Sequence, residues 1–168
     1  MREGFTEDGY ICDQEKLTDY PYRTTTSNYN GCGWIACFNV LKYLGRAPEA
    51  ADVCSTMDHM HRLRFPGPTT MRVVRKYLGS QGVSFTEVRG RKACAAAAEI
   101  AQAGIFMYFE ERIPHYVAFV STGDGRFRCF NVNDDMWDFE SGMGDFAAKH
   151  FRGGIVHLFA VPPGGQEE

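Results

Sequence analysis

The first candidate for chemistry is a cysteine between two glycines, in the segment Gly31-Cys32-Gly33. Apolar residues follow Cys32 at three- and four-residue steps as far as Leu44, which predicts a helix that Gly45 ends. Cys32 would then lie in the first turn, where unpaired N–H groups and the helix dipole favour a thiolate. A thiolate at this position could act as a nucleophile. The alternative is a structural cysteine buried in a core helix, a common environment for this residue.

A thiol nucleophile needs a base, and the base needs a group that orients it. Among the five histidines, His115 is the best placed, because Pro114 before it fits only at the start or edge of a strand. The imidazole is therefore expected at the rim of a sheet. The other histidines are expected in less suitable places: His59 and His61 in a solvated basic loop (with a role at a substrate rim as the alternative), His150 solvated on a short helix, and His157 within a strand.

The candidates for the orienting group follow a predicted hairpin. Thr122–Gly125 contains an Asp-Gly turn signal, so the strand expected at about 126–132 returns beside His115. Asn131, Asn133 and Asp134 near its end could each accept a hydrogen bond from the imidazole N–H.

The elements that must carry these residues differ between the two parts of the chain. Helices are expected at about 48–57, 69–78 and 91–103, with short strands at 10–12 and 83–88. After Gly104, strands are expected at 105–110, 114–121, 126–132 and 154–161, with a helix at 145–151. The pattern predicts one α+β domain over 1–168, with a helical part at about 26–103 packed on an antiparallel sheet at about 104–161.

Composition narrows the class of protein. The net charge of -3 gives no basic surface for nucleic acid, and no apolar run is long enough to span a bilayer. The polar, acidic start of the chain predicts no signal peptide, so a cytoplasmic location with six reduced cysteines is expected. The cysteines lack zinc-site spacing, and no metal or other cofactor is expected.

These residues resemble those of a known family. Asn30-Gly31-Cys32-Gly33 at a helix start, the later strand His115-Tyr116-Val117 and a hairpin ending in Asn or Asp resemble the papain-like cysteine peptidases. The likeness is greatest to the bacteriocin-processing branch, the double-glycine leader peptidases and their stand-alone relatives. It covers roughly residues 26–161.

The resemblance implies a site with Cys32 as nucleophile, His115 as base and Asn131 as third member, or Asn133 or Asp134 if the turn holds an insertion. The sequence departs from the family at the oxyanion glutamine, whose position is taken by Thr26. Asn28 or Asn30 could supply the missing side-chain donor, beside the backbone N–H of Cys32. Trp34 also replaces a proline that the family often has.

The function expected from these residues is hydrolysis of a peptide or related amide through an acyl-thioester on Cys32. Two alternatives remain: an acyltransferase that uses the same Cys32–His115 chemistry, and a non-catalytic peptide-binding member of the fold. The partner in each case is a peptide or amide substrate.

Overall fold

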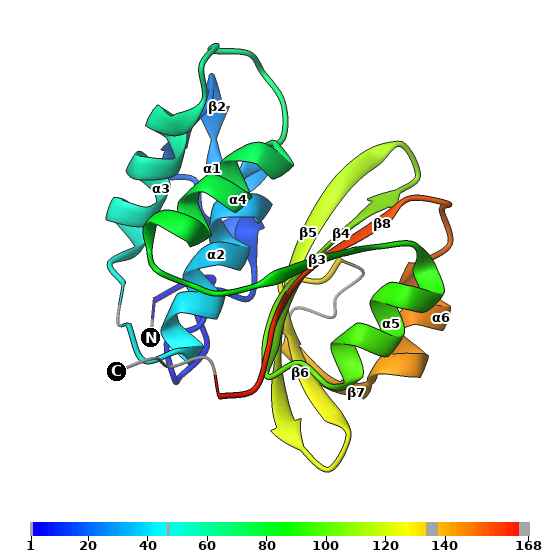
Figure 1. The fold of residues 1–168 in the computed structure, drawn as a ribbon. Helices are drawn as coiled ribbons and strands as arrows, with labels where there is room; N and C mark the ends of the chain where they lie inside the picture. Colours follow the sequence, from blue (N-terminus) through cyan, green and yellow to red (C-terminus); the bar gives the residue numbers. More distant parts are fainter. Residues whose placement is uncertain (1, 47, 134–137, 165–168) are drawn as a thin grey trace.

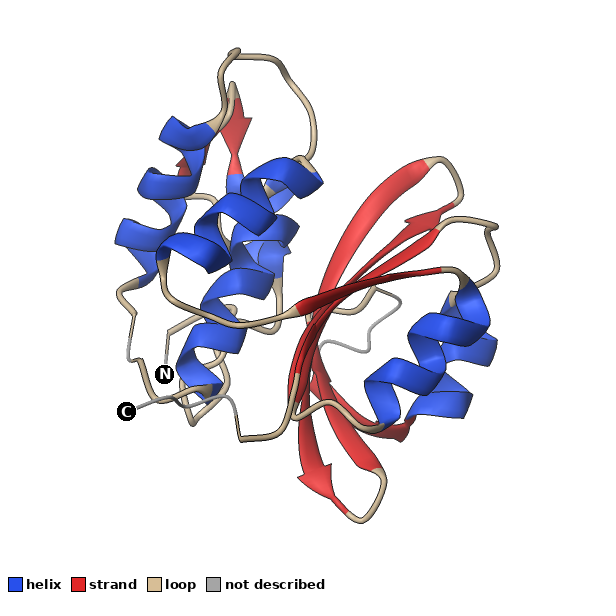
Figure 2. Cartoon of the chain, in the orientation of Figure 1, coloured by secondary structure: helices blue, strands red, loops and turns tan. Residues whose placement is uncertain are grey.

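A six-stranded antiparallel sheet separates two groups of helices in the computed structural model, which describes residues 2–46, 48–133 and 138–164 (Figure 1). Helices α1 to α4 lie on one face of the sheet and α5 and α6 on the other (Figure 2). The molecule therefore has three layers. No helix in these described ranges is long and apolar enough to cross a membrane.

The helical layer is built around one buried helix. Its elements are η1 (Gln14–Lys16), β1 (Pro21–Tyr22), β2 (Thr25–Thr26), α1 (Ser27–Asn30), α2 (Cys32–Tyr43), α3 (Ala50–Met60) and α4 (Met71–Ser80). The first ten residues of α2 are all buried, because α2 packs on the sheet with one side and on α3 and α4 with the other. Gly45 follows α2 with a φ of 74°, and Thr70 caps α4 by accepting a hydrogen bond from the Val73 N–H.

The sheet has the strand order β3-β8-β4-β5-β6-β7. Its strands are β3 (Thr86–Arg89), β4 (Ala103–Glu110), β5 (Ile113–Gly123), β6 (Arg126–Phe130), β7 (Asp138–Gly142) and β8 (Val156–Val161). Asp124 and Gly125 join β5 to β6 with φ values of 54° and 72°, as expected of a tight two-residue hairpin turn. Side chains alternate along the strands: Ile105 and Tyr116 face α2, whereas Phe106 and Val117 face α5 and α6.

Several features differ from the sequence prediction. The strand β3 and the helix α5 (Arg91–Glu99), which precede Gly104, pair with or cover the sheet rather than joining the helical layer. The edge strand β7 was not predicted, and the expected strand at 10–12 is only a bridge between Phe5 and Ile11. The last helix, α6 (Met143–His150), begins two residues before its predicted start.

Candidate active site

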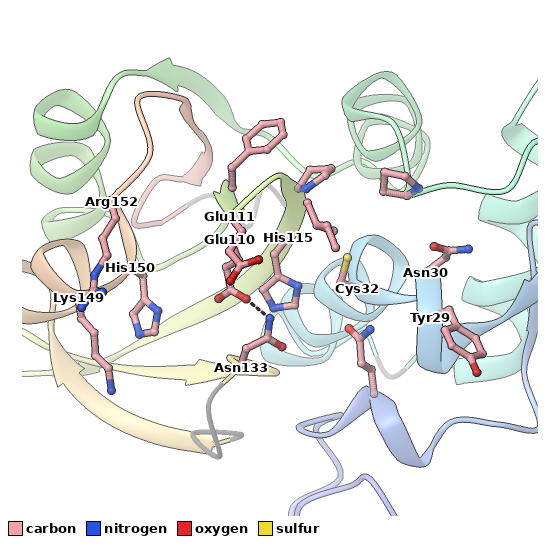
Figure 3. A pocket seen from close by; sticks show the side chains of 15 residues that line it. Tyr29, Asn30, Cys32, Glu110, Glu111, His115, Asn133, Lys149, His150 and Arg152 are labelled. Atoms are coloured by element: carbon pink, nitrogen blue, oxygen red, sulfur yellow. Dashed lines mark hydrogen bonds between the residues drawn. The ribbon is translucent and has the colours of Figure 1, made fainter.

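Cys32 and His115 line the same cleft, which has a volume of about 580 Å³ (Figure 3). Tyr29, Asn30 and Cys32 form the side contributed by α1 and α2, and Glu110 and His115 lie opposite on β4 and β5. Lys149, His150 and Arg152 lie at the far end (Figure 3). The cleft thus brings the predicted nucleophile and base together from the two layers of the fold.

Cys32 is the first residue of α2 and is only 4% exposed. The short helix α1 ends immediately before it, and Gly31 caps α2 without a side-chain hydrogen bond. Gly33, the next residue, packs against Thr69 so closely that a Cβ atom there would lie 2.4 Å from the threonine Cβ. The thiol therefore lies at a helix start, as the sequence predicts. The surroundings of this helix start are tightly packed.

His115 is buried, and its ring orientation is fixed by one strong contact. Its Nε2 lies 2.8 Å from the main-chain carbonyl oxygen of Asn131. Since a carbonyl only accepts, Nε2 carries the hydrogen, and Nδ1 of the neutral ring is free of a proton. Burial lowers the pKa of His115, but hydrogen bonding and charge interaction with Cys32, the Asn131 carbonyl and the Glu110 carboxylate together raise it above its ordinary value.

Asn131 contacts His115 through its main chain and not through the side-chain amide that the sequence interpretation assumed. Its backbone adopts a left-handed φ of 60°, which turns the carbonyl toward the imidazole and the side chain away from it. The side-chain Oδ1 instead accepts a hydrogen bond from the Gln14 main-chain N–H at 3.0 Å, and Nδ2 donates to Gln14 Oε1 at 2.8 Å.

Asn133 and Asp134 were the other two candidates for the group that orients His115. Asn133 lines the cleft and donates to the Glu110 carboxylate, as the dashed line in Figure 3 shows. Asp134 lies outside the described residues.

The structure places the two predicted oxyanion donors differently with respect to the cleft. The Asn28 side chain accepts a hydrogen bond from the Thr26 hydroxyl, and Asn28 is not among the described residues that line the cleft. Asn30 does line it, with its Nδ2 donating to Thr25 Oγ1 at 3.0 Å. No group of three His, Cys, Asp or Glu side chains suited to a metal ion occurs in the described part of the chain.

Comparison with solved structures identifies this architecture. The peptidase domain of Streptococcus ComA, a bi-functional ABC transporter involved in a quorum-sensing pathway, aligns with a TM-score of 0.56 over 78% of this chain and 90% of that chain, at 13% identity. The chain has the fold of a papain-like peptidase domain.

A second solved structure also aligns, whereas the sequence comparisons find no match. A double-glycine motif protease from an AMS/PCAT transporter, solved in complex with the leader peptide, aligns over 78% of this chain and 84% of that chain, with a TM-score of 0.48 and 16% identity. No protein-family model matches the chain, and no curated protein matches it by sequence.

Several residues of the cleft were missed at the sequence level, among them Gln14, Glu110 and Lys149. Gln14 lines the cleft beside Cys32 and His115, although it lies in an irregular polar segment far from Cys32 in sequence. No motif marks Gln14, because its position depends on how the N-terminal segment packs against α1 and on its contact with Asn131.

Of the remaining four histidines, one lines the cleft and three lie elsewhere. The expectation that His150 is solvated is wrong, since it is 7% exposed and lines the cleft. His157 is a buried strand residue whose Nε2 lies 3.2 Å from Glu87, which fits a structural role. His61 lies 3.2 Å from the Tyr22 hydroxyl, and His59 lies on α3; neither lines the cleft.

Proposed function

We propose that this protein is a thiol hydrolase of the cysteine peptidase type, with Cys32 as nucleophile and His115 as base. The observation that carries the proposal is the His115 ring in the cleft with Cys32, its Nε2–H bonded to the Asn131 carbonyl. This contact leaves Nδ1 as the proton acceptor of the pair. In this proposal, Asn131 orients the base through its main chain.

The reaction follows from these positions. His115 takes the proton from the Cys32 thiol, and the groups that raise its pKa stabilise the resulting imidazolium. The thiolate attacks the carbonyl carbon of the substrate, a C–S bond forms, and the carbonyl electrons move to oxygen. Collapse of this intermediate breaks the C–N bond as His115 protonates the leaving amine. A water molecule, deprotonated by His115, then cleaves the thioester.

A peptide is the substrate class that this site fits best. The ComA domain with the same fold is a peptidase domain, and the cleft of about 580 Å³ between the two layers is lined by Cys32. Hydrophobic side chains at its rim, including Tyr29 and Ile113, are exposed and available to apolar side chains of a peptide.

A cleavage assay with a complex peptide mixture tests this function. The unaltered protein should cleave a subset of peptides, detected as new termini by mass spectrometry, and Cys32→Ala should cleave none. Cys12→Ala provides the matched control, because Cys12 is outside the cleft, and it should retain cleavage. Products that form only when an amine is added would instead identify an acyltransferase. If neither product type forms, or if Cys32→Ala still cleaves, the proposed function is wrong.

A further inference from the structure

We propose that a second groove, separate from the cleft, binds a linear polyamine, an aliphatic chain that carries an ammonium group at each end. The groove has a volume of about 600 Å³ and lies between α3 and the N-terminal segment before β1 (residues 2–20). It is on the part of the helical layer that is furthest from the sheet (Figure 1). In the described part of the chain it shares no lining residue with the cleft of Cys32 and His115, so the proposal does not depend on the proposed function.

Apolar side chains line much of this groove. One wall is a face of α3, on which Ala51, Ser55 and Asp58 recur at three- and four-residue steps. Phe5 from the N-terminal segment and Phe38 from α2 add aromatic surface. Methylene groups of a bound ligand can be removed from water against these side chains.

The groove already holds one organic cation, which belongs to the chain itself. The Arg2 guanidinium lies 4.9 Å from the ring centroids of both Phe5 and Tyr20. It also lies 3.6 Å from the Asp19 carboxylate. Aromatic faces and carboxylates both attract organic cations, and Arg2 is the only lysine or arginine among the described residues that line the groove.

Two further carboxylates in the groove form no ion pair with a lysine or arginine of the described ranges. Glu49 immediately precedes α3, and Asp58 lies in its last turn, where its Oδ1 accepts a hydrogen bond from the Arg23 main-chain N–H at 2.8 Å. The rise of a helix places the two residues about 13 Å apart along the axis of α3. Negative groups at both ends of an apolar groove favour a ligand with a cationic group at each end.

The Tyr20 hydroxyl is a buried polar group at this groove. Tyr20 is 5% exposed, and its hydroxyl has no hydrogen-bond partner among the described residues. The residue is nevertheless held firmly. Its carbonyl accepts hydrogen bonds from the Ser27 main-chain N–H at 2.9 Å and from the Ser27 hydroxyl at 3.0 Å, and its ring centroid lies 5.4 Å from that of Trp34.

The surroundings of the Tyr20 hydroxyl belong to the groove. Burial has the largest effect on the pKa of Tyr20 and raises it. The side chains whose charges also act on this pKa all line the groove: Arg2, Asp19, Cys54 and Glu49. A buried hydroxyl without a partner lacks the hydrogen bonds that it makes in water, and an ammonium N–H of a bound polyamine supplies one.

Titration of the full chain with spermidine, a linear polyamine, tests the proposal. Isothermal titration calorimetry at low ionic strength should show one spermidine bound per chain, and added salt should weaken binding, because the charges at the groove ends are exposed to screening. Cadaverine, a five-carbon diamine, should also bind. Pentylamine has the same carbon chain with one ammonium group and should bind about fivefold more weakly, the most that one exposed ion pair contributes.

Two substitutions test the ends of the groove. Glu49→Gln and Asp58→Asn each remove one negative charge with little change in shape, and Asp58→Asn keeps an oxygen that accepts the Arg23 N–H. Each should weaken spermidine binding about fivefold. Glu99→Gln, which removes a negative charge on α5 outside the groove, is the matched control and should leave the affinity unchanged.

The variant Tyr20→Phe separates ligand binding from folding. It keeps the ring that packs on Trp34 and removes only the hydroxyl that lacks a partner. It should weaken spermidine binding about tenfold, the effect of losing a hydrogen bond to a charged group, and it should not lower the urea concentration at which the protein unfolds. Tyr43→Phe, which removes a hydroxyl on α2 outside the groove, should leave the affinity unchanged.

Several results would overturn the proposal. Absence of spermidine binding, or binding that neither Glu49→Gln nor Asp58→Asn weakens, would mean that the groove is not a polyamine site. Equal affinities for cadaverine and pentylamine would mean that only one end of the groove binds a cation. If Tyr20→Phe lowered the stability to urea and left the spermidine affinity unchanged, the hydroxyl would have a structural role alone.

Discussion

Gly33, the residue after Cys32, packs closely against the side chain of Thr69. A Cβ atom on Gly33 would lie 2.4 Å from Thr69 Cβ and 2.5 Å from Thr69 Oγ1. Thr69 cannot move freely, because its Oγ1 is 2.6 Å from the Tyr22 hydroxyl and its carbonyl accepts a hydrogen bond from Tyr116. The glycine after Cys32 is therefore required by packing, in addition to the open access to the thiol that the sequence suggested.

Gly33→Ala is accordingly expected to destabilise the protein by about 1–3 kcal/mol, the usual cost of overpacking a core. Gly79→Ala is the matched control: Gly79 is also helical, nothing lies within 4 Å of its added Cβ, and alanine should stabilise the helix slightly. Urea unfolding measures both. In a Thr69→Gly background, Gly33→Ala should lower the free energy of unfolding much less. If Gly33→Ala alone unfolds with the same free energy as the unaltered protein, the packing argument is wrong.

Two residues of the cleft could be predicted from their immediate sequence neighbours. Cys32 is marked by its flanking glycines and by the predicted helix that follows it, and His115 is marked by the proline that places it at a strand edge. The sequence predicted that Asn131 contacts His115, but it did not predict that the main-chain carbonyl makes this contact. The left-handed φ of Asn131, which turns the carbonyl toward His115, is not evident from the sequence. Gln14 could not be predicted, since its position depends on partners distant in the chain.

Among the elements, the N-terminal segment that carries Gln14 is anchored to α2 by a buried asparagine. Asn39 Oδ1 accepts a hydrogen bond from the Ile11 N–H at 2.9 Å, and its Nδ2 donates to the Ile11 carbonyl at 2.8 Å. Both residues are fully buried. The side-chain amide thus satisfies two main-chain groups that have no water to replace it.

Replacement of Asn39 by leucine should therefore release this segment. Each main-chain group left without a partner costs about 1–3 kcal/mol, and hydrogen exchange at the Ile11 amide should become much faster. Asn30→Ala, which removes an asparagine with one exposed side-chain contact, should change the free energy of unfolding by less than about 0.5 kcal/mol. Unchanged protection of Ile11 in Asn39→Leu would show that other contacts hold the segment.

The segment between α3 and α4 is attached in a similar way, at both of its ends. The Tyr22 hydroxyl lies 3.2 Å from His61 Nε2 and 2.6 Å from Thr69 Oγ1, and the segment between them contributes Pro68 to the cleft. Burial and the Arg23 charge lower the pKa of His61 to about 4, although Asp58 opposes this shift. His61 is therefore neutral in the folded protein at neutral pH.

This shift predicts a pH dependence with a definite sign. The unfolded chain binds a proton at His61 below about pH 6.5, whereas the folded protein does so only near pH 4. The free energy of unfolding should fall as the pH is lowered from 6.5 to 4. His61→Gln should reduce this slope, and His59→Gln should leave it unchanged. Urea unfolding at several pH values measures it, and equal slopes in all three proteins would contradict the assignment.

The placement of elements also shows what periodicity cannot predict. A helix was expected at about 91–103 from its alanine content and forms over Arg91–Glu99, but sequence pattern does not say which face of a sheet a helix covers. Cys94 and Ala98 are the buried residues of α5, and they pack with Phe106 and Phe119 on the face opposite α2. The edge strand β7 was missed because its sequence, Asp-Phe-Glu-Ser-Gly, contains one large apolar residue and so lacks the alternation of apolar and polar residues that marks a strand.

Across the whole molecule, the sheet separates two hydrophobic cores. The larger core joins α2, α3 and α4 to one face of β4 and β5, and the smaller one lies between the other face and α5 and α6. The α+β class and the halves that carry Cys32 and His115 could be predicted, because helix and strand periodicities separate along the chain. The three-layer arrangement could not, since it depends on long-range packing.

The N-terminal segment also connects the two layers that form the cleft. It bonds to α2 through Asn39, whereas Tyr10 stacks on Phe130 and Asp8 pairs with Arg128 on β6. The Arg128 hydrogen bond is the main reason that the pKa of Asp8 is lowered to about 2. The layers that carry Cys32 and His115 are therefore linked beyond the core itself.

The measurement that tests the proposed pair of Cys32 and His115 most directly is the rate of iodoacetamide labelling at each cysteine. The labelled sites are mapped by mass spectrometry in the unaltered protein and in His115→Ala. Burial raises the pKa of Cys37, and it raises the pKa of Cys54 and Cys94 to about 11, so these thiols should react slowly at neutral pH. Cys32 should be labelled first, and loss of His115 should slow it roughly tenfold or more, because an unassisted thiol is only a few per cent thiolate at pH 7. Faster labelling of any other cysteine, or a Cys32 rate that His115→Ala leaves unchanged, would show that the two residues do not act as nucleophile and base.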